Sequence, residues 1–345
     1  MSVPSRHGRR LVLAALAVLI LLLTGCSGGG ESPSAEDTRA VETEPDALPV
    51  TIEHRFGSTT ITDPPRRVVS VGLTDHDALL ALGVTPVATT RWFGDYPGAI
   101  GPWAREALGD APDPVVLHNQ NGIQFERIAE LEPDLILGLY SELSQADYDT
   151  LSRIAPTIAP PPGQPDYGIS WRELTTTVGK AIGKPAQAQR VVADVDRTLE
   201  RLRDEHPEFE GATALVATLY EGYFLYGDDD PRSQLLTDLG FTLPQELDDL
   251  VGDQFGASIS KEHADVLDAD VVVWLTDDGD AELREDPLYS KLRPAKERRE
   301  VLVEENSDFG AAFSQVSALS VPYVLEHLVP RLQAAVDGDP STVAD

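Results

Sequence analysis

The stretch AQAQRVVADVDRTLERLRDE, residues 186–205, decides the fold, because it predicts one long helix near the middle of the chain. Its apolar residues recur at helical spacing and share one face: Val191, Val195, Leu199 and Leu202. A helix of this length spans about 30 Å, which is enough to cross from one domain to another. The same pattern is also typical of an ordinary surface helix, so the regions on either side must decide between the two.

Short apolar runs alternate with helical patterns on both sides of this stretch. Before it we predict strands over 67–71, 85–89, 134–139 and 157–159, and helices over 75–82, 124–131, 144–154 and 171–182. After it we predict strands over 213–219, 223–226, 269–275 and 300–303, and helices over 232–239, 260–267 and 321–336. This rhythm indicates mainly parallel sheets. The predicted fold class is therefore α/β, with two lobes joined by a single long interlobe helix.

The N-terminal residues have the layout of an export signal over 1–25. Three arginines precede an apolar run over 11–23, which is shorter than the ~20 apolar residues that span a bilayer. Leu23-Thr24-Gly25-Cys26 resembles a bacterial lipobox, which implies cleavage before Cys26 and a lipid on its thiol. An ordinary secretory cleavage site beside a chance cysteine is the alternative. Arg9-Arg10 leaves the twin-arginine export route open.

The residues after Cys26 predict a tether and set the remaining boundaries. Residues 27–47 are rich in Gly, Ser, Pro and acids without apolar periodicity, so a lipidated Cys26 and a flexible tether are expected over 26–48. We then place an N-terminal lobe at 49–170, an interlobe helical segment at 171–207 and a C-terminal lobe at 208–345. The expected location is the outer face of the cell membrane, to which the protein is held by its lipid alone.

The charge of the chain excludes some partners. The net charge is −31, and removal of 1–25, which holds three arginines and no acid, leaves it near −34. Such a field repels phosphate backbones and anionic lipid surfaces, which argues against nucleic acid as a partner. Cys26 is the only cysteine, so no internal disulfide can form and the folded domain depends on burial.

No motif in the chain supports catalysis or direct metal binding. Neither a GxGxxG nor a phosphate-binding loop follows a predicted strand, and no serine or cysteine stands in a nucleophile elbow. The histidines after residue 26 are scattered and have no chelating spacing, so neither metal ligands nor catalytic residues are predicted. We expect Thr74 or Asp75 to be the N-cap of the helix that follows, rather than 75–77 to be an acid/base site, and we expect the acids in 228–230 to form a solvated turn.

Five segments together resemble the substrate-binding proteins of ABC importers for ferric siderophores and cobalamin, the class III binding proteins with a helical backbone. They are PRRVVS (65–70), DALLALGV (77–84), FERIAELEPDLI (125–136), YDTLSRIAP (148–156) and the segment 260–273, which mirrors the third in the second lobe. Their order and spacing cover nearly all of residues 60–336.

The resemblance implies a ligand cleft between the lobes, little closure around the rigid helix, and a monomer that delivers its ligand to an ABC permease. It also implies one glutamate per lobe that docks onto permease arginines, and motif position makes these Glu126 and Glu262. Each falls in the first turn of a predicted helix, where a carboxylate is favoured by the helix dipole. The alternative is that both acids only complement their own helix ends.

A ferric siderophore offers an organic shell, so its receptor needs aromatic faces and a few donors rather than metal ligands. Such residues belong on loops after strand ends. The ligand-binding residues predicted on this ground are Arg91, Trp92, Tyr140, Tyr220, Tyr223, Arg232 and Trp274. Core or rim packing is the alternative for each aromatic residue.

The function expected from the sequence is the capture of an iron–siderophore complex for uptake. A trianionic catecholate complex would need several convergent arginines, and only Arg91 and Arg232 are nominated, which favours hydroxamate or mixed chelates. No catalytic cofactor is expected. A haem or cobalamin receptor of the same fold is the alternative within the class, and an envelope α/β enzyme is the alternative outside it.

Overall fold

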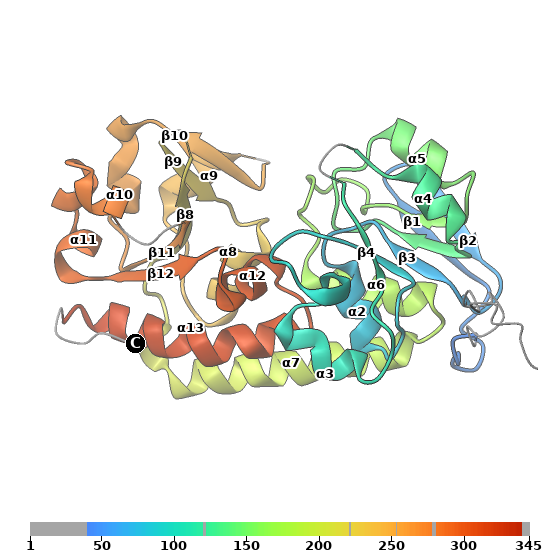
Figure 1. The fold of residues 1–345 in the computed structure, drawn as a ribbon. Coiled ribbons are helices and arrows are strands. Elements are labelled where there is room, and N and C mark those ends of the chain that lie inside the picture. Colours follow the sequence, from blue (N-terminus) through green and yellow to red (C-terminus); the bar gives the residue numbers. More distant parts are fainter. Residues whose placement is uncertain (1–39, 120–121, 221, 253, 278–280, 340–345) are drawn as a thin grey trace, which may run out of the picture. The chain divides into compact units, whose positions relative to one another are not determined.

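The computed structural model describes residues 40–119, 122–220, 222–252, 254–277 and 281–339, and in these ranges it has two five-stranded sheets (Figure 1). The predicted signal peptide, Cys26 and most of the tether lie outside the described residues. None of the helices in the described ranges combines the length and the apolar character needed to cross a membrane.

The first sheet is parallel throughout. Its spatial order is β5 (Val115–Leu117), β4 (Ala88–Thr90), β3 (Val68–Ser70), β6 (Leu135–Leu137) and β7 (Thr157–Ile158). Both faces of the sheet are buried, with Val68 and Leu135 in one apolar cluster and Val69 and Ile136 in another. Burial on both faces explains why these strands read as continuous apolar runs in the sequence.

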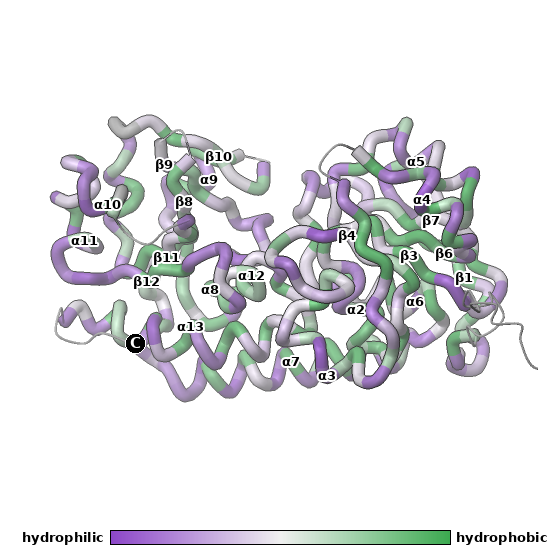
Figure 2. Tube along the Cα trace, viewed as in Figure 1, coloured by the Kyte–Doolittle hydropathy of each residue, from purple (hydrophilic) through white to green (hydrophobic). Residues whose placement is uncertain are grey.

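Short helices and a hairpin complete this half of the chain. The hairpin pairs β1 (Val50–His54) with β2 (Gly57–Ile61). The helices are α2 (Asp75–Ala81), η1 (Pro97–Ala99), η2 (Pro102–Ala104), α3 (Arg105–Leu108), α4 (Phe125–Glu130), α5 (Gln145–Leu151) and α6 (Trp171–Ala181). Figure 2 shows the hydrophobic colour concentrated on the strands of the sheets.

The second sheet is mixed. Its spatial order is β10 (Gly256–Ile259), β9 (Tyr223–Tyr226), β8 (Ala214–Leu219), β11 (Val271–Thr276) and β12 (Glu300–Glu304). β8, β11 and β12 are parallel, whereas β9 and β10 are antiparallel to their neighbours. Its helices are η3 (Pro207–Phe209), α8 (Pro231–Asp238), α9 (Gln245–Val251), η4 (Lys261–Leu267), α10 (Ala281–Glu285), η5 (Tyr289–Lys291), α11 (Arg293–Glu297), α12 (Asp308–Gln315) and α13 (Ser320–Asp337).

One helix, α7 (Pro185–Glu205), packs on the cores of both halves. Ala188 belongs to the apolar cluster of the first sheet, while Val195 and Leu199 belong to that of the second. Val191 lies between them and packs against both clusters. The single apolar face therefore bridges two cores, as the interlobe prediction requires, and Figure 1 shows α7 beneath both sheets. The predicted fold class is confirmed.

Hydrogen bonds between the two halves add to this connection, one buried at Asp77 and one exposed at Tyr96. Asp77, in α2, accepts hydrogen bonds at Oδ2 from the Ser317 hydroxyl (2.5 Å) and from the Trp103 indole (2.8 Å). The Tyr96 hydroxyl donates to Asp308 at the start of α12 (2.8 Å). Because Asp77 is fully buried, breaking its bonds would leave an unpaired charge in the interior, which is costly. These contacts resist separation of the two halves.

Several elements differ from the sequence-based expectation. The strands β1, β2, β5 and β10, the helices α3, α9, α10, α11 and α12 and the 3₁₀ helices η1, η2, η3 and η5 were not predicted. Residues 261–267 form a 3₁₀ helix rather than an α-helix. β5 has three residues, too few for a periodic signal, and β10 (GASI) carries little apolar pattern. The missed elements are short, and they lie at sheet edges or outside the main strand order.

The packing of α7 predicts that the protein changes little on ligand binding. We expect the radius of gyration to shift by less than about 1 Å, as in other preorganised complexes. Small-angle scattering with and without a bound ferric chelate measures this change. A contraction of several ångströms would contradict the stiff connection, and the Ser317→Ala variant, which loses the bond to Asp77, serves as a comparison.

Candidate functional site

A cavity of about 340 Å³, called here the interlobe pocket, is lined by residues of both halves. The first half supplies Leu73, Trp92, Phe93, Tyr140 and Tyr167, and the second supplies Tyr226, Asp230, Arg232, Phe255 and Glu305. Six of these ten side chains are aromatic. The lining therefore offers broad apolar faces together with one cation and two carboxylates.

Strand ends bring most of these residues together. Trp92 follows β4, Tyr140 follows β6, Tyr226 closes β9 and Glu305 comes directly after β12. The carboxyl ends of parallel strands open at one edge of a sheet, where ligands of α/β proteins bind. The carboxyl ends of β4, β6 and β12 contribute to the pocket in this way, whereas Tyr226 ends β9, which runs antiparallel to its neighbours.

A buried ion pair lies on the second-half wall of the pocket. Asp230 accepts hydrogen bonds from Arg232 Nε (2.9 Å) and Arg232 Nη2 (2.7 Å), and its Oδ1 also accepts from the Arg232 backbone N–H (2.9 Å), which caps α8. The guanidinium carbon stands 3.7 Å from the ring centroid of Tyr226. The expectation of a solvated turn at 228–230 is wrong for Asp230, which is 1% exposed, because it pairs with the buried cation of Arg232 two residues later in the chain.

The tyrosines of the pocket stay protonated. Burial raises the pKa of the Tyr140 phenol well above its ordinary value, and the Asp230 carboxylate raises it further. Burial also raises the pKa of Tyr167 to about 12, with Glu142 adding to the shift. Their hydroxyls are therefore hydrogen-bond donors at neutral pH and can bond to outward oxygens of a bound molecule.

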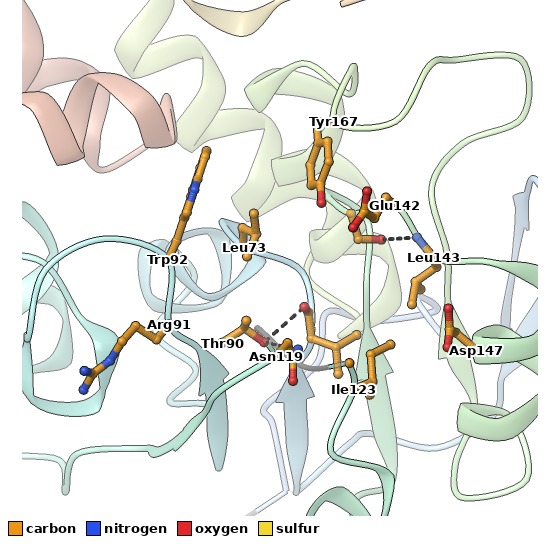
Figure 3. Close-up of a pocket in the computed structure, with 13 residues that line it drawn as sticks. Leu73, Thr90, Arg91, Trp92, Asn119, Ile123, Glu142, Leu143, Asp147 and Tyr167 are labelled. Atoms are coloured by element: carbon orange, nitrogen blue, oxygen red, sulfur yellow. Dashed lines mark hydrogen bonds between the residues drawn. The ribbon is translucent and has the colours of Figure 1, made fainter. Parts of the chain in front are cut away.

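A second cavity of about 470 Å³, called here the polar pocket, adjoins the first and shares Leu73, Trp92 and Tyr167 with it. Its remaining lining residues are Val71, Thr90, Arg91, Asn119, Gly122, Ile123, Ser141, Glu142, Leu143 and Asp147. Figure 3 shows Trp92 and Tyr167 on either side of Leu73, with Asn119 near Thr90. Asn119 donates to the Thr90 hydroxyl (3.2 Å). The volumes of both pockets fall in the range of small-molecule sites.

A buried carboxylate holds the segment that carries Tyr140. Asp75, in α2, accepts hydrogen bonds from the backbone N–H groups of Leu139 (2.7 Å) and Tyr140 (3.2 Å). Of the two expected N-cap candidates, Thr74 is the N-cap of α2, although its side chain makes no cap hydrogen bond. Asp75 does not cap the helix and reaches across to the end of β6 instead. Asp75 thus positions a residue of the interlobe pocket.

The structure brings four of the seven predicted ligand-binding residues to these pockets. Trp92, Tyr140 and Arg232 line the interlobe pocket, and Arg91 lines the polar pocket, where it also pairs with Asp95 (2.7 Å). Tyr220 lies in the turn after β8, is 64% exposed and lines neither pocket. Whether any of them binds a ligand stays a prediction.

Tyr223 and Trp274 lie in the core of the second half instead. Both are fully buried in a cluster with Tyr289, and the Trp274 indole donates to the Tyr289 hydroxyl (2.8 Å). The physical reason is strand parity. Successive side chains alternate between faces, so Tyr223 and Tyr226 of β9 point to opposite sides, and only Tyr226 reaches the pocket.

The predicted docking and lipidation residues have different positions. Glu126 is exposed in the first turn of α4. Glu262 falls in η4, but its side chain lies outside the described residues, as does Cys26. In the described part of the chain, no group of three or more His, Cys, Asp or Glu residues could hold a metal ion.

Sequence reasoning missed five lining residues of the interlobe pocket besides Leu73 and Phe93: Tyr167, Tyr226, Asp230, Phe255 and Glu305. Glu305 could have been found, because it lies two residues after the predicted strand over 300–303. Tyr167 could not, since it directly follows the proline-rich stretch 160–166 and has a left-handed backbone (φ 60°). Arg55 holds this stretch by donating to the Gln164 carbonyl (2.8 Å) and pairing with Asp166.

Comparison with known proteins identifies the family. Residues 68–305 match the family of periplasmic binding proteins. The chain belongs to this family. Its members are substrate-binding proteins.

Individual relatives cover most of the chain. It is 29% identical to the probable siderophore-binding lipoprotein YfiY of Bacillus subtilis, over 79% of each chain. A periplasmic solute binding protein from Mycobacterium smegmatis is 36% identical, with a TM-score of 0.73 over 83% of this chain and 98% of that one. PiaA of Streptococcus pneumoniae, solved in complex with ferrichrome, is 28% identical, with a TM-score of 0.77 over 84% and 99%.

The buried Asp75 predicts a specific pH dependence of stability. Burial raises its pKa to about 6 from 3.8, against the opposing effect of its backbone hydrogen bonds. Folding therefore takes up a proton between these values, so the contribution of Asp75 to stability is greatest below the window and falls as pH rises through it. The change is on the order of 3 kcal/mol.

We expect Asp75→Asn to lose this component of the pH dependence, measured by urea unfolding between about pH 4 and pH 7. Asp149→Asn, which changes an exposed acid of α5, is the matched control and should keep the wild-type profile. An Asp75→Asn profile parallel to that of the wild type would show that Asp75 does not titrate in this window.

Proposed function

We propose that this protein is the extracytoplasmic, lipid-anchored receptor of an ABC importer, and that it captures a ferric siderophore in the interlobe pocket for iron uptake. The observation that carries this proposal is a pocket between two sheets with six aromatic side chains in its lining. Flat apolar faces pack well on the organic shell of an iron chelate. Tyrosine hydroxyls and Arg232 supply donors for the oxygens of that shell.

The names of the relatives support the same ligand class. YfiY is named as siderophore-binding, another Bacillus subtilis relative as an Fe(3+)-citrate-binding protein, and PiaA was solved with ferrichrome. A receptor for an intact chelate leaves the iron coordinated by the siderophore. It therefore has no need of metal ligands of its own.

The location and the anchor follow from the N-terminal residues. The relatives are lipoproteins or periplasmic proteins, which supports an extracytoplasmic location. The lipobox-like sequence supports a lipid on Cys26, with residues 26–48 as a tether between the membrane and the lobes. We further propose that the protein acts as a monomer, since one chain carries both walls of the pocket.

Delivery requires contact with the permease. We propose Glu126 and Glu262 as the docking residues, supported by their matching positions in the two lobe motifs and by the exposure of Glu126 in a first helical turn. Carboxylates in such positions are available for bidentate pairing with arginines.

The first test of the proposal is ligand binding by isothermal titration calorimetry. The tag-free chain from residue 27 onward is titrated with ferrichrome, ferrioxamine B, ferric enterobactin, haemin and cyanocobalamin. We expect at least one ferric siderophore to bind. Trp92→Ala should weaken that binding by about tenfold or more, because an aromatic wall of the pocket is lost.

Tyr220→Ala is the control for this experiment, because Tyr220 is exposed outside both pockets. Its affinity should stay within about twofold of the wild type. Binding of haemin or cyanocobalamin alone would move the protein to the alternative receptor class. If no compound bound, the proposed function would be refuted.

The second test separates docking from capture. Replacing both Glu126 and Glu262 with glutamine should abolish uptake of a radiolabelled ferric chelate by cells that depend on this protein, yet leave the chelate affinity of the purified protein unchanged. The matched control replaces Glu130 and Asp265, exposed acids of the same two helices. Loss of affinity in the Glu126/Glu262 variant would instead place these acids in the ligand site.

A further inference from the structure

The two adjoining pockets contain more acid than base. Their charged lining residues are Arg91, Glu142, Asp147, Asp230, Arg232 and Glu305. Two cations therefore face four carboxylates. A ligand enters a site whose own charge is negative, inside a chain that is also strongly acidic.

Both cations are already paired within the protein. Asp230 binds Arg232 through two parallel hydrogen bonds, and the two side chains are 2% and 9% exposed. Arg91 lines only the polar pocket, and its partner Asp95 (2.7 Å) is 89% exposed and lies outside the pocket lining. The bidentate pair of Asp230 and Arg232 is difficult to separate, because each partner left alone would be a buried, uncompensated charge. Arg232 can thus orient a ligand oxygen, but it brings no net positive charge.

Besides Asp230, the interlobe pocket contains one further carboxylate in its lining, that of Glu305. It is half-buried at the end of β12, lines the interlobe pocket, and has no ion-pair partner in the described ranges. Arg232 lies near enough to affect its titration, but the bidentate bonds of Arg232 go to Asp230. Asp277, on the neighbouring β11 end, adds a further negative charge to this part of the site. A partly buried carboxylate attracts a ligand cation and repels a ligand anion more strongly than one in open water does.

The charge of a ferric chelate depends on its donor groups. Three hydroxamates cancel the charge of Fe(III), and a pendant amine makes the complex cationic. Three catecholates leave a complex with three negative charges. In the interlobe pocket such a trianion would meet Glu305 and Asp230, and Arg232, the cation of its lining, is already paired with Asp230. An uncharged shell would pack on Trp92, Tyr140 and Phe255 without this cost.

We infer that the interlobe pocket selects ferric chelates of zero or positive net charge, the trihydroxamate class, and that Glu305 is a specificity-determining residue that rejects anionic chelates. This inference rests on the proposed function and narrows its ligand class.

The test compares three probes of similar iron chemistry and different charge, by calorimetric titration at pH 7.5 and constant ionic strength. They are ferrioxamine B (cationic), ferrichrome (neutral) and ferric enterobactin (trianionic). The wild type should bind the first two more tightly than the third. Glu305→Gln should weaken ferrioxamine B by about tenfold, leave ferrichrome within about twofold and strengthen ferric enterobactin, because only the charge is removed.

Glu304→Gln is the matched control, since Glu304 is the exposed neighbour of Glu305 and lines neither pocket. It should leave all three affinities unchanged, and equal melting temperatures of the two variants would exclude a folding effect. Tightest binding of ferric enterobactin, or an unchanged order of affinities in Glu305→Gln, would overturn this inference while leaving the receptor function intact. If none of the three ferric chelates bound, the proposed function itself would fall.

Discussion

The packing of α7 on two cores is the constraint on which the rest of the structure depends. Ala188 is buried in the first core, Val195 and Leu199 in the second, and Val191 contacts both. Because one rigid helix is part of both cores, neither sheet can move far without exposing apolar surface. The carboxyl ends of strands from both sheets are thereby held around one pocket. The aromatic walls from each half can then act as a single binding surface.

Polar groups inside the protein extend this constraint to the ligand site. Asp77 ties α2 to Ser317 in the second half, and Asp75, two residues earlier, fixes the backbone that presents Tyr140. The two carboxylates belong to the same short helix but point to different sides of it. Asp77 connects the two halves, and Asp75 positions Tyr140. Asp230 likewise holds the guanidinium group of Arg232 in place through two hydrogen bonds. These buried acids therefore contribute more to the geometry of the pocket than the charged groups on its surface do. Each of them takes part in several hydrogen bonds.

Much of the fold could be predicted from local pattern, because buried parallel strands and long amphipathic helices have strong periodic signals. The strands β3, β6, β8, β11 and β12 and the helices α6, α7 and α13 all lie within a few residues of their predicted bounds. Elements with weak signals were missed. β5 is too short, β10 lacks an apolar pattern, and the β1–β2 hairpin precedes the region where the α/β rhythm begins.

The candidate site shows the limit of the same reasoning. The expectation that residues after strand ends would line a pocket reached Trp92 and Tyr140, and Arg232 was reached as a residue that opens a predicted helix. It failed for Tyr223 and Trp274, because a strand presents two faces and the sequence does not say which one turns toward the other half. It also failed for Asp230, whose burial depends on a cation that becomes its neighbour only when α8 forms.

By itself, then, the sequence determined the α/β class, the bridging helix and the family motifs, because these depend on short-range periodicity and composition. Only the tertiary structure decided which aromatic side chains meet, and which carboxylates are buried and with what partner. Those outcomes depend on the parity of strands and on contacts between segments more than two hundred residues apart, such as that of Asp77 with Ser317. A pattern within a short stretch of sequence cannot predict contacts between segments that lie so far apart in the chain.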